Sequence, residues 1–183
     1  MIASILMIGA LLMIIVPVLA ALFLWLFGFR LIPNTHCAVV EKRWSEKGSL
    51  SNNLIALEGE AGFQPDVLRG GIHFRTPLKY KVHKVPLVTV PQGQIGYVFA
   101  RDGRPLRPKQ TLGQLIKESD DFQNSRGFLE NGGQRGPQRG ILREGTYAIN
   151  LSLFVVILED GIYHLSIDSG DKPTFLKMAK HIA

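Results

Sequence analysis

The first 29 residues lack Asp, Glu, Lys and Arg, and the first charged residue of the chain is Arg30. Leu, Ile, Ala, Met, Val and Phe make up almost all of this run. A helix needs about 20 apolar residues to cross a bilayer core, so the absence of charge predicts a membrane anchor over residues 1–30. Aromatic and basic residues gather where a span meets water, which gives four candidate membrane-interface residues: Trp25, Phe27, Phe29 and Arg30.

This run also lacks the basic start of a cleaved signal peptide, and nine uncharged residues follow the small-residue site at 18–20. Pro17 raises a re-entrant hairpin as an alternative. Proline inside a spanning helix usually produces only a kink, so a single kinked span is favoured. Basic residues follow the run and none precedes it, which predicts a single-pass protein with a cytoplasmic C-terminal part: Arg30, Lys42, Arg43 and Lys47.

Cysteine is scarce. The single Cys37 excludes an internal disulfide framework and fits a reducing compartment. We interpret Cys37 as a small buried hydrophobic residue. The alternative is that it is a juxtamembrane cysteine that carries a lipid. The net charge of +6 lies entirely beyond the uncharged leader. A basic surface held near a bilayer would be attracted to anionic headgroups, although an ordinary solvated surface explains the excess equally well.

Motifs of catalysis and metal binding are missing. The five histidines have no ligand spacing, and neither G-x-S-x-G nor H-E-x-x-H occurs. The glycine-rich stretch 132–140 lacks the Gly-Lys-Ser/Thr end of a phosphate loop and the aromatics of a single-strand binder. We therefore expect no enzyme activity, cofactor, metal or nucleic-acid partner. The arginines of this stretch are candidate contacts for lipid headgroups or a partner protein: Arg135, Arg139 and Arg143.

The remaining pattern is rich in β-branched and aromatic residues and predicts an α+β fold with mainly antiparallel strands. Strands are expected at 36–43, 79–90, 94–100, 145–149 and 153–159, with a hairpin turn at Asp160-Gly161. Short helices are expected at 112–118, capped by Thr111, and at 122–130, capped by Asp120 or Asp121, with a weaker helical pattern at 172–181.

Two segments of the chain resemble two later ones. Ile32-Pro33 resembles Val90-Pro91, and VLRGGIHF at 67–74 resembles ILREGTYA at 141–148. The first pair is 58 residues apart and the second 74, so the later copy should carry an insertion near 105–136. We therefore expect an internal duplication, with units at 31–89 and 90–183 and with Gly71 and Gly145 at equivalent turns.

The N-terminal span is followed by the segments IPNTHCAVVEKRW, LRGGIHF, VPQGQIGYVFARDGRPL and RGPQRGILREGTYAINLSLFVVI. Through these features the chain resembles the flotillin-like branch of the SPFH (stomatin, prohibitin, flotillin) group over residues 32–160. The resemblance implies an SPFH-like head behind a transmembrane helix. It also implies a membrane-anchored scaffold that assembles into rings or cages and organises membrane microdomains. Expected partners are the lipid bilayer, other copies of the chain and a small NfeD-like membrane protein.

Members of that group continue into a long helical region with heptad repeats, and no such repeat occurs before Ala183. The chain is thus expected to be either the N-terminal part of a longer protein or a short relative with weaker assembly. The alternative function is a small membrane-tethered regulator that binds one partner, such as a membrane protease or transporter.

Overall fold

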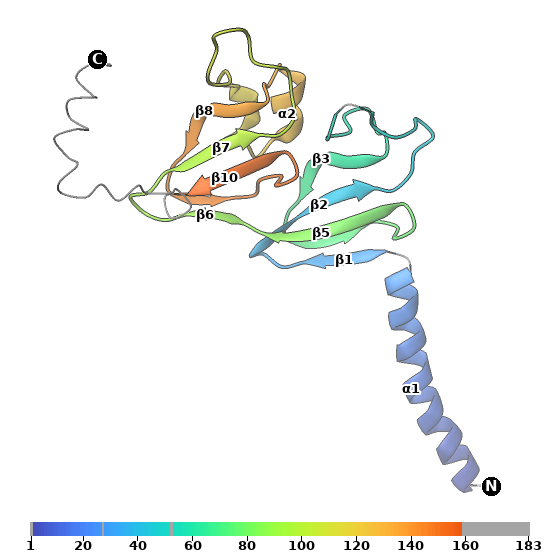
Figure 1. Cartoon of the computed structure of the whole chain (residues 1–183). Coiled ribbons are helices and arrows are strands. Elements are labelled where there is room, and N and C mark those ends of the chain that lie inside the picture. Colours follow the sequence, from blue (N-terminus) through green and yellow to red (C-terminus); the bar gives the residue numbers. More distant parts are fainter. Residues whose placement is uncertain (1, 27, 52, 159–183) are drawn as a thin grey trace, which may run out of the picture.

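In the computed structural model the described residues are 2–26, 28–51 and 53–158. They form one long helix, ten short strands and a few helical turns (Figure 1). All the pairs between named strands are antiparallel. The α+β class with mainly antiparallel pairing is therefore confirmed. The predicted turn at Asp160-Gly161 and the helical pattern at 172–181 lie outside the described residues.

The N-terminal helix α1 (Ile2–Leu26) runs through Pro17 without interruption and extends away from the strands (Figure 1). The side chains described within it are those of Gly9 and residues 11–23, and all are exposed. Among the residues that the structure describes, no helix is found long and apolar enough to cross a membrane. The side chains of Trp25 and Phe27 lie outside the described part of the chain.

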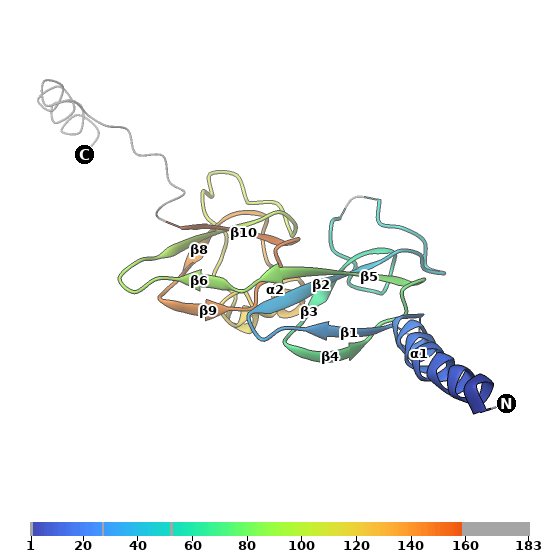
Figure 2. The ribbon, with the colours of Figure 1, turned by 90° about the horizontal axis from the view of Figure 1, so that it is seen from below.

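The strands fall into two sets, which we name unit 1 and unit 2. Unit 1 comprises β1 (Phe29–Ile32), β2 (His36–Lys42), β3 (Gly62–Leu68), β4 (Gly71–Phe74) and β5 (Tyr80–Pro86). Unit 2 comprises β6 (Val88–Val90), β7 (Gly96–Ala100), β8 (Gly136–Leu142), β9 (Gly145–Tyr147) and β10 (Phe154–Leu158). Unit 1 follows α1 and lies between this helix and unit 2 (Figures 1 and 2).

Unit 2 repeats the strand pairing of unit 1. In unit 1, β2 is the centre of a sheet in the order β3-β2-β5, and β1 pairs with β4 in a separate ladder. In unit 2, β7 is the centre of a sheet in the order β8-β7-β10, and β6 pairs with β9. Each strand of unit 2 therefore has a counterpart at the same place in unit 1.

The correspondence extends to single residues. Ile32 at the end of β1 pairs with Gly71, and Val90 at the end of β6 pairs with Gly145. Both glycines have positive φ, +132° and +149°, a backbone conformation that residues with a Cβ rarely adopt. The structure thus places Gly71 and Gly145 at matching positions in the two ladders.

Two glutamines repeat the same local hydrogen bonds. The Gln64 amide donates to the carbonyls of Glu60 and Gly62, at 3.2 and 3.1 Å. The Gln138 amide donates to the carbonyls two and four residues before it, at 2.8 and 2.6 Å. Each strand pair also has a register shift beside its glutamine, so β3 and β8 begin with the same irregularity.

The hydrophobic cores correspond as well. The core of unit 1 consists of Ile32, Ala38, Val40, Leu68, Tyr80 and Val82. The structurally equivalent residues of unit 2 are Val90, Gly96, Val98, Leu142, Phe154 and Val156. Unit 2 adds Phe122 and Phe128, whose rings pack edge-on against Phe154 with centroids 5.2 and 5.0 Å away. The second core is larger because the insertion contributes these rings.

The insertion is shorter than the expected 105–136. The backbone bond from Ala56 to Phe63 in unit 1 has its counterpart from Gly113 to Pro137 in unit 2, both 2.8 Å. The bonds Ala61–Gly48 and Arg135–Arg104 also correspond, both 2.9 Å. The extra residues therefore lie within 114–134, which hold the short 3₁₀ turn η1 (Lys117–Ser119) and the helix α2 (Ser125–Glu130).

Three predictions about local structure are wrong. Residues 112–118 form no α-helix, because Gly113 pairs with β8 and only η1 follows. The second helix begins at Ser125 and is capped by Asn124, whose carboxamide oxygen accepts from Gly127 at 2.9 Å. Asp120 and Asp121 lie in the preceding turn with positive φ. The strand expected at 79–90 is split at Leu87, whose N–H donates to Thr35.

Candidate interaction surfaces

Within residues 2–26, 28–51 and 53–158, no group of three or more His, Cys, Asp or Glu side chains is placed to hold a metal ion. Cys37 is buried in β2, and its thiol lies 3.9 Å from the Ile149 carbonyl of unit 2. Burial raises the pKa of the Cys37 thiol, which keeps it neutral and unreactive. Two exposed apolar surfaces are candidate sites in the part of the chain that the structure describes.

The first surface is the outer face of the β1–β4 ladder, which we name the apolar ladder: Phe29, Leu31, Ile72 and Phe74. Phe29 pairs with Phe74, and Leu31 pairs with Ile72. The two phenylalanine rings contact edge-on at 5.6 Å between centroids. Leu31 and Ile72 are 65 % and 72 % exposed. Large contiguous apolar patches on a surface mark sites of contact with a membrane or another protein.

The apolar ladder begins directly after α1. Phe29, one of the predicted interface residues, is the first residue of β1, and Arg30 is the second. Gly28 joins the helix to the strand with a φ of +86° and lies against the Arg75 carbonyl, which leaves no room for a side chain. This tight joint keeps the ladder close to the end of the helix.

The second surface lies on the sheet of unit 2, and we name it the aromatic face: Tyr97, Phe99, Ile141 and Ile157. Tyr97 pairs with Ile157 on one side and Ile141 on the other. All four side chains are between 39 % and 46 % exposed. Side chains alternate along β7, so Val98 and Ala100 point into the core while their neighbours face outward.

The three predicted arginines border this face. Arg135, Arg139 and Arg143 are exposed, and they alternate in phase with the outward residues Pro137 and Ile141 of β8. Arg143 also offers its backbone carbonyl to the Tyr147 hydroxyl at 3.0 Å. Arg139 lies within β8, Arg135 directly before it and Arg143 directly after it, so the arginines lie along the same side as the outward residues of this strand.

In unit 1 the face equivalent to the aromatic face is covered. Val39, the counterpart of Tyr97, is only 2 % exposed, and Pro65 on β3 is also buried. The covering part is unit 2 itself. Its Asn150 is fully buried and donates to the carbonyls of Gln64 and Pro65 at 3.0 and 3.1 Å.

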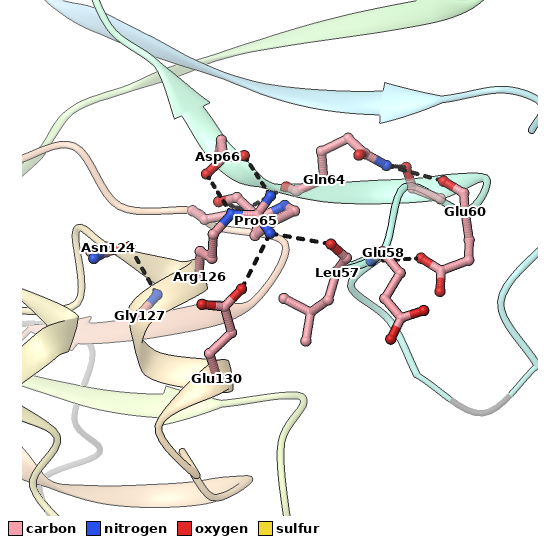
Figure 3. Close-up of polar contacts among 12 residues, drawn as sticks. Leu57, Glu58, Glu60, Gln64, Pro65, Asp66, Asn124, Arg126, Gly127 and Glu130 are labelled. Carbon is pink, nitrogen blue, oxygen red and sulfur yellow. Dashed lines mark hydrogen bonds and ion pairs between the residues drawn. The ribbon is translucent and has the colours of Figure 1, made fainter.

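The insertion strengthens this contact between the units (Figure 3). Arg126 of α2 forms an ion pair with Asp66 of β3 at 2.8 Å and also donates to the Leu57 carbonyl at 3.2 Å. Its third partner is Glu130, one turn along the helix, at 3.4 Å. The hydrogen bond to Asp66 raises the pKa of Arg126 further above its ordinary value. The ion pair is exposed, so it orients the units more than it stabilises them.

Comparison with protein-family models, with curated proteins and with solved structures finds no match to this chain.

Proposed function

We propose that the protein is a membrane-anchored scaffold whose two-unit head resembles that of the flotillin-like SPFH group. The single observation that carries the proposal is the order of features along the chain. An uncharged helix leads through a tight joint into the apolar ladder, and the repeated unit behind it presents a second apolar face. On this proposal the two units descend from one by duplication, as their matched strand pairing supports.

The anchor is supported by the lack of charge before Arg30 and by the exposure of the described α1 side chains. A bilayer would cover those side chains and could also receive the apolar ladder at its surface. Burial of apolar surface contributes about 25 cal/mol per Å² of area removed from water. The head then lies at the membrane with unit 1 nearest the lipid, and the positive-inside rule places it in the cytoplasm.

Assembly is supported by the aromatic face. A head held at a membrane in one orientation meets its neighbours laterally, and this confinement raises the effective concentration for weak contacts. The face of unit 1 that corresponds to the aromatic face is covered by unit 2 of the same chain, whereas the aromatic face itself is open to a neighbouring head. Repetition of a contact between unlike surfaces closes into a ring when the rotation allows it.

The proposal is tested by the mass of the chain in mild detergent, measured by light scattering at several concentrations, alone and within any longer natural form. We expect large assemblies that Phe99→Glu disrupts and that Leu115→Glu, at an exposed position outside the aromatic face, leaves intact. A wild-type protein that stays monomeric at every concentration would exclude the scaffold. The tethered single-partner regulator would then be preferred, with an NfeD-like protein as the first candidate to co-purify.

A further inference from the structure

Unit 1 contains an open cavity of about 700 Å³, lined by β5 and the turn before it and bordered by Arg30 of β1 and Arg43 after β2. Apolar side chains form its lining, and four cations stand around it. The lining residues are Pro77, Leu78, Tyr80 and Val82, and the cations are Arg30, Arg43, Lys81 and Lys84. Among the described residues, none of these four cations forms an ion pair with a carboxylate. The nearby Glu41 is bound instead to His83 at 2.7 Å.

The repeat shows that these cations are not required by the fold. Register identifies the unit-2 counterparts of Arg30, Lys81 and Lys84, which are Val88, Val155 and Leu158. Val88 and Leu158 are partly buried and pack against the unit-2 core. Only Arg43 has a basic counterpart, Arg101. Unit 1 therefore has a cavity bordered by cations, whereas unit 2 has mostly apolar side chains at the corresponding positions.

The chemistry of the cavity selects an amphiphile with an anionic head. Arginine and lysine donate charge-assisted hydrogen bonds to phosphate oxygens, and Arg can do so with two parallel bonds. The apolar lining would accept a hydrocarbon chain, and Leu78 at 81 % exposure extends that lining toward the outside. A soluble anion such as inorganic phosphate would use the cations but not the lining.

We propose that this cavity binds the phosphate headgroup of an anionic membrane lipid, with the first part of an acyl chain against Leu78 and Val82. The inference rests on the proposed membrane attachment, because α1 and the apolar ladder bring the cavity to the lipid surface. It adds to that function a specific lipid preference located in unit 1, distinct from a general attraction of the net charge.

The test measures lipid retained by the full chain in non-ionic detergent, by native mass spectrometry with phosphatidylglycerol, phosphatidylcholine or inorganic phosphate. We expect one phosphatidylglycerol per chain, with phosphatidylcholine and free phosphate retained at least tenfold less. The variant Arg30→Gln with Lys84→Gln should bind phosphatidylglycerol about 25-fold more weakly, since each well-placed cation contributes about fivefold. The control Arg107→Gln with Lys117→Gln removes the same charge from exposed positions between β7 and α2 and should bind like the wild type.

Equal weakening by both double variants would overturn the proposal, because it would show attraction by net charge alone. Equal retention of inorganic phosphate would reassign the cavity to a soluble anion, and no retention by the wild type would remove the site. A photoactivatable phosphatidylglycerol gives a test on the unaltered chain: it should label residues 77–84, and labelling elsewhere alone would contradict the proposal. Alkaline carbonate extraction tests the anchor separately, since a chain released from membranes could still retain lipid in detergent.

Discussion

Units 1 and 2 share five strand positions, but their cores are packed differently. Unit 2 fills its interior with Phe122, Phe128 and Phe154, all nearly inaccessible to solvent. Unit 1 has half-buried Tyr80 where unit 2 has Phe154, and a basic cavity beside it. The same strand pairing therefore supports two differently packed interiors. On our proposal the unit next to the helix accepts lipid, and the distant unit supplies stability and an open face for neighbours.

The largest expected effect separates the two cores. Phe154→Ala removes a fully buried ring that contacts two others, and should lower the free energy of unfolding by about 3–5 kcal/mol. Its counterpart Tyr80→Ala removes a half-buried ring beside a cavity and should cost about half as much or less. Urea unfolding of the full chain in non-ionic detergent measures both. Equal losses would show that unit 1 is as tightly packed as unit 2.

The next effect concerns the contact between the units. Asn150→Ala leaves the carbonyls of Gln64 and Pro65 without their buried donor and should cost about 1–3 kcal/mol. Thr76 occupies the matching turn of unit 1, since both residues accept backbone bonds from the third and fourth residues after them. Thr76→Ala is the matched control and should cost less than about 0.5 kcal/mol. A harmless Asn150→Ala would mean that the two units are held together elsewhere.

The glycine pair tests whether the ladders are equivalent. Gly71→Ala and Gly145→Ala each force a Cβ into a positive-φ conformation and should each cost about 1–3 kcal/mol. Gly145→Ala should be the worse of the two, because the new Cβ would lie 3.2 Å from the Tyr147 hydroxyl, whereas the Gly71 site is open. The same unfolding measurement compares them. Tolerance of alanine at one site alone would break the correspondence.

A smaller effect is expected from the buried thiol of unit 1. Because the folded-state pKa of Cys37 is raised above its ordinary 9.0, the neutral thiol favours the folded chain. That contribution is fully present below pH 9.0 and is lost as the pH rises from there through the raised folded-state value. The stability difference between wild type and Cys37→Ala should therefore shrink in alkaline solution. A difference that stays constant up to pH 11 would show that the folded-state thiol titrates normally.

The smallest effect is expected at the exposed ion pair of Figure 3. Asp66→Asn should cost less than about 1 kcal/mol and should lose that effect in high salt, because both side chains remain accessible to water. Unfolding at low and high salt measures it. A salt-independent loss of several kcal/mol would mean that the pair is desolvated in the assembled protein.

Sequence reasoning could predict the strands that combine β-branched residues with clear borders, such as β2, β7 and β10. It also predicted that the two ladders correspond. This similarity is visible in the sequence because the positive φ at positions 71 and 145 favours glycine at both. It did not assign β3 and β8 as strands, since Pro65, Pro137 and their glycines resemble loops. Their ladders tolerate proline because both strands lie at the outer positions of their sheets.

The candidate sites were predicted only in part. Arg30 and the three arginines in and beside β8 were predicted as contact residues, but the sequence does not show which cavity or face they border. Arg43 follows β2, whereas Lys81 and Lys84 lie on β5, so their common cavity depends on the register between these two strands. The prediction of a helix at 112–118 was wrong for a related reason. Gly113 forms its backbone hydrogen bonds with β8, and local helix propensity does not account for such a long-range contact.

The most direct test of the account places a nitroxide label on each unit in lipid vesicles. In a Cys37→Ala background of the full chain, labels at position 72 on the apolar ladder and 97 on the aromatic face are compared by power-saturation electron paramagnetic resonance. Oxygen partitions into lipid, and a nickel chelate stays in water. The account predicts that position 72 is accessible to oxygen and shielded from nickel, whereas position 97 is accessible to nickel or shielded by a neighbour. Full exposure of position 72 to nickel would contradict it.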